Sequence, residues 1–518
     1  MADNNGFLEP PKALISNNPV GWFRYFGPGA IIASGTIGSG EVLFSSRSGS
    51  LFGYHILWVI VVVSFMKWVL SYSCMRHMIL TGAHPFQRWS QIPGPRGWLP
   101  LFMIVIATVC YPIWYAFLSG VFGTMCQWIF GADTIPGNYD VQIWASIFIM
   151  VSIVITFLGN YSILEKVQMT MIATMLGFMF TSLFYLRPDW GEVFFGTVVP
   201  TPLSYPEWAF RVSPILKDRT PWVEIMMFCS AIGGASFDYL AYASFLRDKK
   251  WGRSHLGIAK EEDLAEAANQ KDHPSRLWVR AAFIDSAVSF IVVAALSTCF
   301  AILGTLVLRP QELLPQGTDL MNHQAQFLTA LSPWLEYFYK AAIFAAFLPM
   351  FYGGPDMAYR VYSEYLNTIG RFRGRLNEKG IKVFAVAWCL IGGMALLWVK
   401  AAYPDLSLIQ FISPAGIYTG ILSSGVYCLV NAWMDRRFLP KPLQMNGFMA
   451  SVNVIAGIAF IYMGMKALWD LAPIKDVIGG WDLAMGGWAA YILLVIQLGI
   501  AVGVAQLTRR YFHPDVDK

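Results

Sequence analysis

Long apolar segments alternate with short polar loops along almost the whole chain. A helix needs about 20 apolar residues to cross a bilayer, and about twelve segments reach that length. This pattern predicts an all-α, polytopic membrane protein with one continuous bundle of helices and no appended soluble domain. The segments lie at residues 22–47, 53–80, 98–130, 140–159, 163–186, 221–246, 277–307, 333–365, 381–400, 405–434, 447–469 and 484–508.

The composition agrees with a lipid bilayer as the surrounding solvent. Of 518 residues, 56% are hydrophobic and only 13% are charged, which is unlike an ordinary soluble domain. The net charge of +5 does not indicate nucleic-acid binding, because the basic residues lie in loops rather than on one face. The cysteines lie singly inside apolar segments, which predicts buried small side chains rather than disulfides or a metal motif. They are Cys74, Cys110, Cys126, Cys229, Cys299, Cys389 and Cys428.

Lysine and arginine gather in alternate loops, which indicates the orientation of the chain. The loops after the even-numbered segments are rich in them, apart from the loop after the fourth, whereas the loops at 131–139 and 308–332 are poor. Because basic loops stay on the cytoplasmic side, we predict cytoplasmic tails at 1–20 and 511–518 around a transmembrane domain at 21–510. The first residues lack the pattern of a cleavable signal, which agrees with a retained cytoplasmic tail. No mitochondrial or chloroplast targeting pattern is evident, so a bacterial inner (plasma) membrane is the default localisation.

The most polar stretch of the chain lies at 260–273, between the sixth and seventh segments. We interpret it as a solvated linker, with a short cytoplasmic helix as the alternative.

Glycines interrupt both the first and the sixth segment. Glycines within 35–40 precede Glu41 in the first segment. In the sixth, Gly233 and Gly234 precede Asp238. Unwound backbone at membrane depth must face protein or a cavity. Glycine interruptions at matching places in two halves are typical of inverted-repeat transporters, whose substrate site lies between the half-helices.

The matching interruptions predict two repeats of five segments. The repeats would span 21–187 and 220–435, and the last two segments, within 447–508, would be peripheral helices. The alternative is that the glycines merely let helices pack closely. That alternative explains less well why a carboxylate follows each interruption, because a carboxylate inside a membrane is costly without a partner or water.

Three further ionisable residues lie deep in apolar segments. Lys67 is expected to be a counter-ion of a buried carboxylate rather than a substrate ligand, and Asp285 is a pathway or structural charge. Asp356 follows Gly-Gly-Pro at 353–355, a third potential break, so a cavity-lining role and a structural ion pair are equally open. In the tenth segment, Gln410 offers a neutral oxygen donor to a cavity.

The sequence GPGAIIASGTIGSGEVLFSSRSGSLFGYHILW at 27–58 resembles, without a gap, the first helix of the natural resistance-associated macrophage protein (Nramp) family of metal transporters. Weaker similarity follows at MILTGAHPFQ (78–87), LEKVQ (164–168) and AYASFLRDK (241–249), around Asp285 and in the eighth segment, so the resemblance covers roughly residues 20–440. It implies a LeuT-type fold and a divalent metal ion held between broken first and sixth helices.

The residues that the resemblance places at the metal differ from the family pattern. The family's metal-binding Asp falls on Gly38, its Asn on Glu41 and its sixth-helix Met on Ala235. A site without the thioether and with carboxylate and carbonyl oxygens in its place favours hard ions such as Mg²⁺ or Mn²⁺. The expected metal-binding residues are therefore Glu41, Asp238, Gly38, Ala231, Ala235 and Gln410.

The leading hypothesis is therefore transport of a divalent cation by alternating access, without a bound cofactor, by a protein assumed to be a monomer in the lipid bilayer. The third segment has no charged residue to carry protons, which favours uncoupled passage. The alternative is a LeuT-fold carrier for an organic solute such as an amino acid or amine. Carboxylates at both breaks would repel an anion and tolerate an amine. An enzyme is not expected, because the sequence has neither HExxH nor GxSxG.

Overall fold

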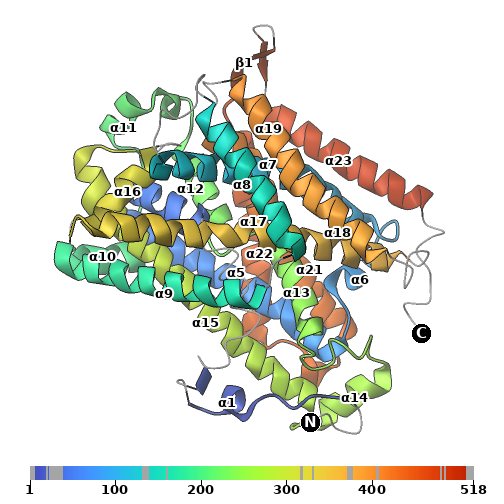
Figure 1. Cartoon of the computed structure of the whole chain (residues 1–518). Helices are drawn as coiled ribbons and strands as arrows, with labels where there is room; N and C mark the ends of the chain where they lie inside the picture. The colour runs from blue at the N-terminus through green and yellow to red at the C-terminus, as the bar shows by residue number, and fades with distance from the viewer. Residues whose placement is uncertain are drawn as a thin grey trace.

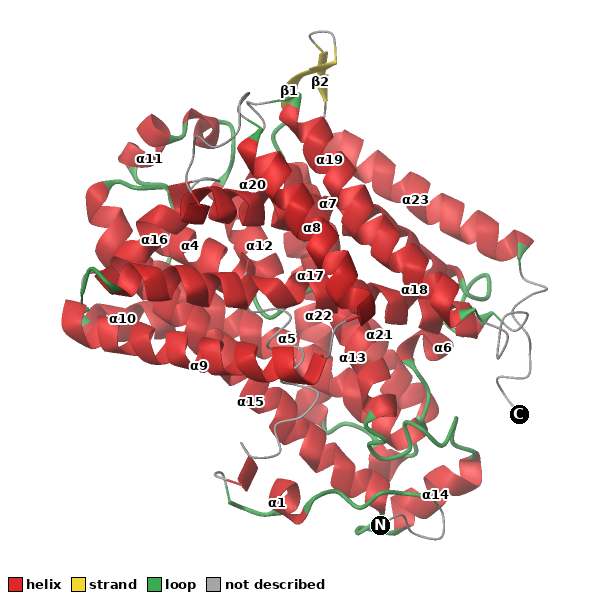
Figure 2. Ribbon diagram, viewed as in Figure 1, coloured by secondary structure: helices red, strands yellow, loops and turns green. Residues whose placement is uncertain are grey.

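Helices make up almost all of the computed structural model, and they pack side by side in one bundle (Figures 1 and 2). The structure describes residues 6–18, 21–22, 39–130, 139–158, 161–314, 319–329, 332–369, 377–403, 408–478, 481–483 and 486–508.

Eight helical runs within these residues are long and apolar enough to cross a membrane. They are Glu41–Thr81, Trp98–Phe130, Asp140–Phe157, Pro221–Asp248, Pro274–Gln311, Glu378–Ala401, Gly447–Trp469 and Gly487–Leu507. The fifth, eighth and tenth apolar segments of the sequence are helical as well, over Tyr161–Leu186, Leu335–Thr368 and Leu408–Phe438. The hydrophobic pattern therefore located these helices to within a few residues.

The long helices are in part composite, because short π-helical turns join α-helical stretches within one run. The α-helical stretches are α4 (Ser45–Phe52), α5 (Leu57–Thr81), α7 (Trp98–Phe130), α8 (Asp140–Leu158), α9 (Tyr161–Leu186), α12 (Pro221–Ala231), α13 (Ser236–Asp248), α15 (Pro274–Leu303), α17 (Leu335–Thr368), α18 (Glu378–Val386), α19 (Gly392–Ala401), α20 (Leu408–Gly416), α21 (Ser423–Phe438), α22 (Gly447–Trp469) and α23 (Gly487–Leu507). The π-helical turns are η1 (Ser39–Phe44), η4 (Gly304–Leu308), η6 (Ala387–Ile391) and η7 (Ile417–Leu422).

Short elements lie between the long helices. They are α1 (Lys12–Ile15), α6 (Pro85–Trp89), α10 (Trp190–Val198), α11 (Glu207–Val212), α14 (Glu261–Asn269) and α16 (Asp319–Thr329), with 3₁₀ turns η2 (Gly53–Ile56), η3 (Pro214–Lys217), η5 (Arg309–Gln311) and η8 (Lys441–Leu443). Two strands, β1 (Ile474–Ile478) and β2 (Trp481–Leu483), pair antiparallel in a hairpin between α22 and α23. The sequence pattern did not predict this hairpin.

Two expectations about secondary structure were wrong. The polar stretch at 260–273 is not only a linker, because Glu261–Asn269 form α14, with three acidic residues in its first turn, where they favour a helix. The Gly-Gly-Pro at 353–355 does not break the eighth segment, because α17 runs without interruption from Leu335 to Thr368. Neighbouring helices can compensate a helix-breaking sequence when it is packed inside a bundle.

Burial separates the centre of the bundle from its edge. In the most apolar part of Pro221–Asp248, 83% of residues are buried inside the protein, against 17% in Gly487–Leu507. The interrupted sixth segment is therefore surrounded by other helices, whereas α23 presents most of its surface outward (Figure 1). Exposed leucine, isoleucine and valine on α23 are the side chains that a bilayer accepts.

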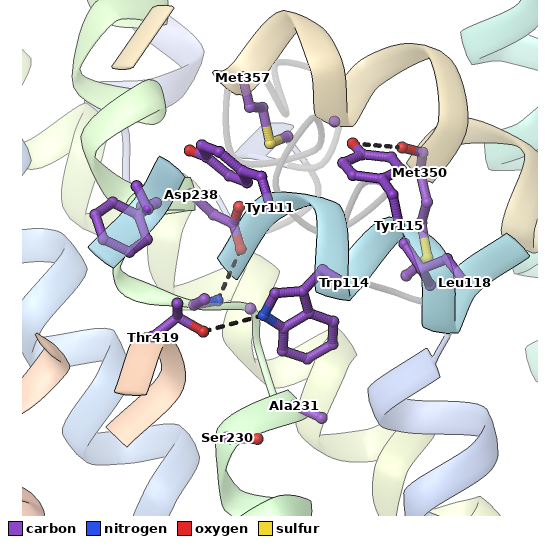
Figure 3. Close-up of a pocket in the computed structure, with 15 residues that line it drawn as sticks. Tyr111, Trp114, Tyr115, Leu118, Ser230, Ala231, Asp238, Met350, Met357 and Thr419 are labelled. Atoms are coloured by element: carbon purple, nitrogen blue, oxygen red, sulfur yellow. Dashed lines mark hydrogen bonds between the residues drawn. The ribbon is translucent and has the colours of Figure 1, made fainter. Parts of the chain in front are cut away.

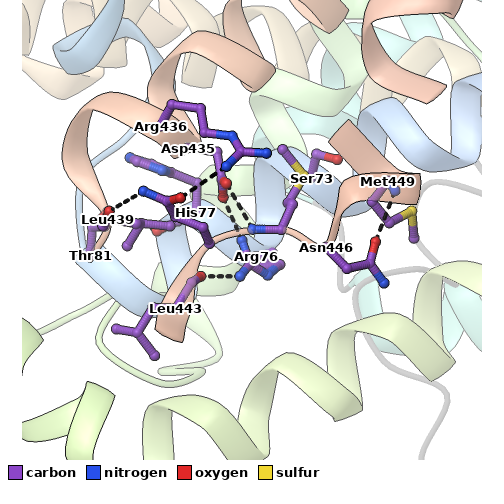
Figure 4. Close-up of polar contacts among 12 residues, drawn as sticks. Ser73, Arg76, His77, Thr81, Asp435, Arg436, Leu439, Leu443, Asn446 and Met449 are labelled. Carbon is purple, nitrogen blue, oxygen red and sulfur yellow. Dashed lines mark hydrogen bonds and ion pairs between the residues drawn. The ribbon is translucent and has the colours of Figure 1, made fainter. Parts of the chain in front are cut away.

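A buried polar network ties α5 to α21 and to the loop that leads into α22 (Figure 4). Arg76 Nη1 lies 2.7 Å from Asp435 Oδ1, and Arg76 also donates to the carbonyl of Leu443. The second carboxylate oxygen of Asp435 accepts a hydrogen bond from the Met445 backbone N–H at 2.7 Å. Both side chains are at least nine-tenths buried, so the ion pair fixes this end of the bundle.

Replacing Asp435 by alanine is expected to lower the free energy of unfolding by about 3 kcal/mol, because Arg76 would stay buried without its carboxylate. This loss of unfolding free energy is at the lower end of the range for broken buried ion pairs, because Arg76 still donates a hydrogen bond to the Leu443 carbonyl. Thermal denaturation of the detergent-purified protein measures it. Glu312→Ala is the control, since its pair with Arg211 is exposed and contributes less than about 1 kcal/mol. Equal losses of unfolding free energy in both variants would contradict the stabilising role of the buried pair of Arg76 and Asp435.

Candidate substrate site at the interrupted sixth helix

The sixth segment is broken where the glycines predict it. Helix α12 ends at Ala231 and α13 begins at Ser236. Between them, Gly233 has φ +67° and Gly234 has φ +85°, in the left-handed region that glycine adopts without a Cβ clash. The predicted break in the first segment, together with Gly38, lies outside the described residues, which resume at Ser39 in the π-helical turn η1.

Gly233→Ala is expected to lower the free energy of unfolding by about 1–2 kcal/mol, the cost of a left-handed conformation for a residue with a Cβ. The added Cβ would also lie 2.9 Å from Phe290 Cε1. Gly499→Ala in α23 is the matched control, because its Cβ would contact no described atom within 4 Å and alanine favours a helix. The melting temperatures of the two variants test this prediction. A Gly233→Ala protein with the melting temperature of the parent would contradict the strained geometry.

Side chains from three helices satisfy the unwound backbone. Lys67 Nζ, from α5, donates to the carbonyls of Ser230, Ile232 and Gly234 at 3.0, 2.8 and 2.8 Å. Glu41 Oε1, from η1, accepts from the Gly233 N–H at 3.0 Å.

Residues of α13 complete this pattern. Tyr239 donates to the Gly233 carbonyl at 2.8 Å, and Asp238 Oδ2 accepts from the Ala235 N–H at 2.7 Å. The carbonyl of Ala231 has only a long contact with the Gly234 N–H, at 3.4 Å. Polar backbone groups at membrane depth need such partners, and the carbonyl of Ala231 keeps most of its capacity to accept another.

A cavity of about 120 Å³ lies beside the break (Figure 3). Three other helical segments, α7, α17 and η7, form its walls together with the broken helix. Trp114 Nε1 donates to Thr419 Oγ1 at 3.1 Å, and Tyr115 donates to the Met350 carbonyl at 3.2 Å. The lining residues are Ala107, Tyr111, Trp114, Tyr115, Leu118, Ser230, Ala231, Gly234, Ala235, Phe237, Asp238, Met350, Gly354, Met357 and Thr419.

Asp238 is the one acidic side chain among these described lining residues. Its second oxygen, Oδ1, has no role in the bond to Ala235 and can face a ligand. Within the described ranges, no place gathers three or more His, Cys, Asp or Glu side chains as a metal cluster. A cation in this cavity would therefore depend on Asp238 together with neutral oxygen donors and the sulfur atoms of Met350 and Met357.

The structure brings together some of the residues predicted from the sequence and separates others. Ala231, Ala235 and Asp238 line the cavity. Glu41 is fully buried, and its carboxylate accepts a hydrogen bond from the backbone N–H of Gly233, in the break of the sixth segment. Gln410 is displaced from the expected site, because it lines a separate small cavity with Arg219 and Ser413. Thr419 lies nine positions after Gln410, which is about 13 Å along a helix axis.

The three other ionisable residues all have protein partners. Lys67 donates to three backbone carbonyls of the break. Asp285 accepts a hydrogen bond from Tyr242. Asp356 pairs with Arg360 at 3.0 Å and lies 3.7 Å from Lys382, so the geometry favours the structural ion pair over the cavity-lining role.

Sequence reasoning missed the wall that α7 and η7 contribute. Tyr111, Trp114, Tyr115 and Leu118 recur at the spacing of one helix face. That spacing was visible in the third segment, but an uncharged aromatic stripe in a membrane helix is equally suited to lipid or to a neighbouring helix. Thr419 carried no signal, because a lone hydroxyl inside an apolar segment is common.

A second buried cluster of charges lies near the start of α12. Glu224 accepts a hydrogen bond from Arg47 Nε at 3.1 Å, and its other carboxylate oxygen forms an ion pair with Arg219 Nη1 at 3.1 Å. Arg219 also donates to Ser413 Oγ, on α20, at 2.6 Å. The three charged side chains are at most 6% exposed, so this Glu224 cluster holds α4, α12 and α20 together away from water.

Comparison with known protein families shows to which family this chain belongs. Residues 29–470 match the sequence profile described as "Natural resistance-associated macrophage protein-like". The chain belongs to the Nramp family. The match covers well over half of the sequence and includes both the first segment and the interrupted sixth. The family resemblance inferred from the first segment is thereby confirmed, and the chain is a transporter-family protein rather than an enzyme.

Curated relatives share part of the sequence. Metal transporter Nramp6 of Arabidopsis thaliana is 25% identical over 207 residues, which are 38% of this chain and 36% of that protein. The divalent metal cation transporter MntH of Caldanaerobacter subterraneus subsp. tengcongensis is 26% identical over 184 residues, 35% of this chain and 41% of that protein. The chain thus spans well under two thirds of the length of these Nramp relatives.

Solved structures extend the likeness to the complete fold. The manganese transporter of Eremococcus coleocola, in complex with an aromatic bis-isothiourea substituted compound, superposes with a TM-score of 0.66 at 14% identity over 99% of both chains. MHP1, a nucleobase-cation-symport-1 family transporter, gives a TM-score of 0.51 at 12% identity over 94% of this chain and 96% of that one. This Nramp-family chain therefore has the LeuT-type fold of a multi-pass integral membrane protein.

Proposed function

We propose that this Nramp-family chain carries divalent metal cations across a membrane by alternating access, with the cation held beside the break in the sixth helix. The observation that carries the proposal is the carboxylate of Asp238 in a cavity bordered by unwound backbone. Interrupted helices near the midplane supply such sites in transporters. The relatives of known name, a plant metal transporter and a bacterial divalent metal cation transporter, support the same substrate class.

The proposed ligands are oxygens. Asp238 supplies the charge, and the carbonyl of Ala231 and the hydroxyl of Thr419 supply neutral donors in the same cavity. Glu41, in the first segment, would contribute charge while it holds the Gly233 N–H, and Gly38 stays a proposed ligand on the resemblance to the family alone. Oxygen donors favour hard ions such as Mg²⁺ and Mn²⁺, and Mg²⁺ commonly keeps several waters, so few direct protein ligands suffice.

Two methionines complicate the preference for hard ions. The family's soft Met falls on Ala235, but Met350 and Met357 reach the cavity from α17 (Figure 3). Thioether sulfur favours softer transition metals. Since Mn²⁺ accepts both oxygen and softer donors, Mn²⁺ is expected to be transported at least as well as Mg²⁺, and Cd²⁺ reports whether the sulfur atoms take part.

The membrane and the orientation are part of the same proposal. Trp278 Nε1 donates to the Leu8 carbonyl at 2.6 Å, and the Ala259 N–H donates to the Thr81 carbonyl at 2.8 Å. The N-terminal segment therefore lies at the end of the bundle where the basic loops after α5, α13 and α21 meet. Basic loops stay in the cytoplasm, which supports a cytoplasmic N-terminal segment; a cytoplasmic C-terminus and a bacterial inner membrane belong to the same proposal. A functional monomer belongs to the same proposal.

The test is uptake of Mn²⁺, Mg²⁺ and Cd²⁺ into proteoliposomes that contain the purified full chain, with internal pH recorded. Saturable uptake of Mn²⁺ and Mg²⁺ without acidification is the expected result, because no charged side chain of α7 reaches the cavity. No uptake of any of the three ions would overturn the proposal.

A second candidate function has its own observation. Four aromatic side chains, Tyr111, Trp114, Tyr115 and Phe237, surround the carboxylate of Asp238. Aromatic faces with one carboxylate are suited to an organic ammonium ion. Two measurements distinguish a metal transporter from an amine carrier: inhibition of Mn²⁺ uptake by methylammonium and longer alkylamines, and uptake of a labelled amine. Uptake of the labelled amine in place of a metal would favour the amine carrier.

A further inference from the structure

The ammonium group of Lys67 occupies a cradle that the broken helix builds from its own carbonyls. Three backbone oxygens, from Ser230, Ile232 and Gly234, lie within 2.8–3.0 Å of Nζ. Each of the three N–H bonds of the ammonium can therefore point at one carbonyl. Lys67 is fully buried near the middle of α5, at a depth where a charge needs strong compensation.

We propose that this carbonyl cradle is a site for a monovalent cation of about the size of ammonium, and that the chain fills it permanently with Lys67. Carbonyl oxygens freed by an unwound helix are the ligands with which transporters of this general architecture coordinate alkali cations. An ammonium nitrogen and K⁺ approach oxygen at similar distances, so K⁺ and methylammonium are the free cations that fit.

The surrounding charges support a permanent cation at this position. Glu41 and Asp238 both lie close enough to Lys67 for their charges to act on it. The Gly233 N–H donates to Glu41. Removing the lysine charge would therefore take the positive charge away from three carbonyls and from the neighbourhood of two carboxylates.

The cradle borders the cavity, because the two share residues. Ser230 and Gly234 contribute carbonyls to Lys67 and also line the cavity beside Asp238. A small cation that enters the cavity would reach the space left by a shortened side chain at position 67. The proposal therefore predicts that Lys67→Ala creates a binding site for a soluble cation.

The experiment measures the melting temperature of the full-length Lys67→Ala protein in choline, potassium and methylammonium chloride at equal ionic strength. A ligand that binds only the folded state stabilises it by mass action, so K⁺ or methylammonium is expected to raise the melting temperature by at least about 3 °C over choline. The parent protein should show no such difference, because Lys67 already fills the cradle.

Lys340→Ala is the matched control. Lys340 lies on α17, pairs with Glu336 at 3.0 Å and sits 4.4 Å from the Trp128 ring centre, so its removal empties no carbonyl cradle. Its melting temperature should not distinguish K⁺ from choline. Equal melting of Lys67→Ala in all three salts would overturn the proposal, as would the same cation dependence in Lys340→Ala.

Should Lys67→Ala not yield folded protein, Lys67→Leu takes its place. Leucine replaces the first carbons of the lysine side chain and leaves the position of the ammonium group empty beside the three carbonyls, so K⁺ or methylammonium would again be expected to stabilise it over choline. Absence of that difference would overturn the proposal as well.

One consequence rests on the proposed function: metal uptake by the parent needs no K⁺, whereas uptake by Lys67→Ala is restored by it. The melting experiment does not depend on transport, so the two proposals can fail separately. A parent without metal uptake whose Lys67→Ala variant is stabilised by K⁺ would refute only the metal function.

Discussion

Asp238→Asn is expected to reduce Mn²⁺ uptake by about 100-fold, which corresponds to about 3 kcal/mol of lost binding to the cation. Asparagine keeps the shape of the side chain and an oxygen for the Ala235 N–H, so the break in the sixth helix should persist. What disappears is the one carboxylate charge among the described residues that line the cavity. Uptake into proteoliposomes with matched protein content measures the effect.

Asp356→Asn is the matched control for this variant. Asp356 also lies in a membrane-spanning helix, but it pairs with Arg360 and Lys382 outside the cavity. Its uptake is expected to stay within about threefold of the parent, which is less than 1 kcal/mol. Similar losses in both variants would show that Asp238 acts through general stability rather than through the cation.

Glu224→Ala is expected to lower the free energy of unfolding by about 4–5 kcal/mol. Two buried guanidinium groups, Arg47 and Arg219, would then face each other without the carboxylate that both contact at 3.1 Å. Breaking a buried pair costs about 3–5 kcal/mol, and here two guanidinium groups lose the same carboxylate. Ser413 can retain only one hydrogen bond from Arg219.

The melting temperature of the purified Glu224→Ala protein tests this prediction. Glu224→Gln is the second variant, because it keeps two hydrogen-bonding groups near the arginines and should lose less than Glu224→Ala. A Glu224→Ala protein as stable as the exposed-pair variant Glu312→Ala would contradict a structural role of the cluster.

The fold was largely predictable because a bilayer imposes a simple rule on sequence. Apolar stretches of a fixed minimum length must be helices in lipid, and the boundaries of α7, α22 and α23 followed directly. The pattern failed where this rule does not apply. Helix α14 lies in a polar loop, and the hairpin of β1 and β2 follows a span, so neither is constrained by lipid.

At the candidate site, the break in the backbone was predictable from the sequence, but the residues of other helices that line the cavity were not. Two adjacent glycines followed by Asp238 are informative because both features are costly inside a membrane. The partners of the unwound segment depend on which helices surround it, and a single sequence does not specify those contacts. For this reason the sequence pointed to Lys67 as a charge without showing that it binds carbonyls. Gln410 lines a separate small cavity, and its depth along the tenth segment could not be judged from the sequence.

The central claim is that a divalent cation binds beside Asp238 at the break of the sixth helix. Crystals of the full chain soaked in Mn²⁺ and recorded at the manganese absorption edge test it most directly. The account predicts an anomalous peak in the cavity, about 2.2 Å from a carboxylate oxygen of Asp238, that is absent from Asp238→Asn crystals. A manganese peak elsewhere in the protein, with the cavity empty at saturating Mn²⁺, would contradict it.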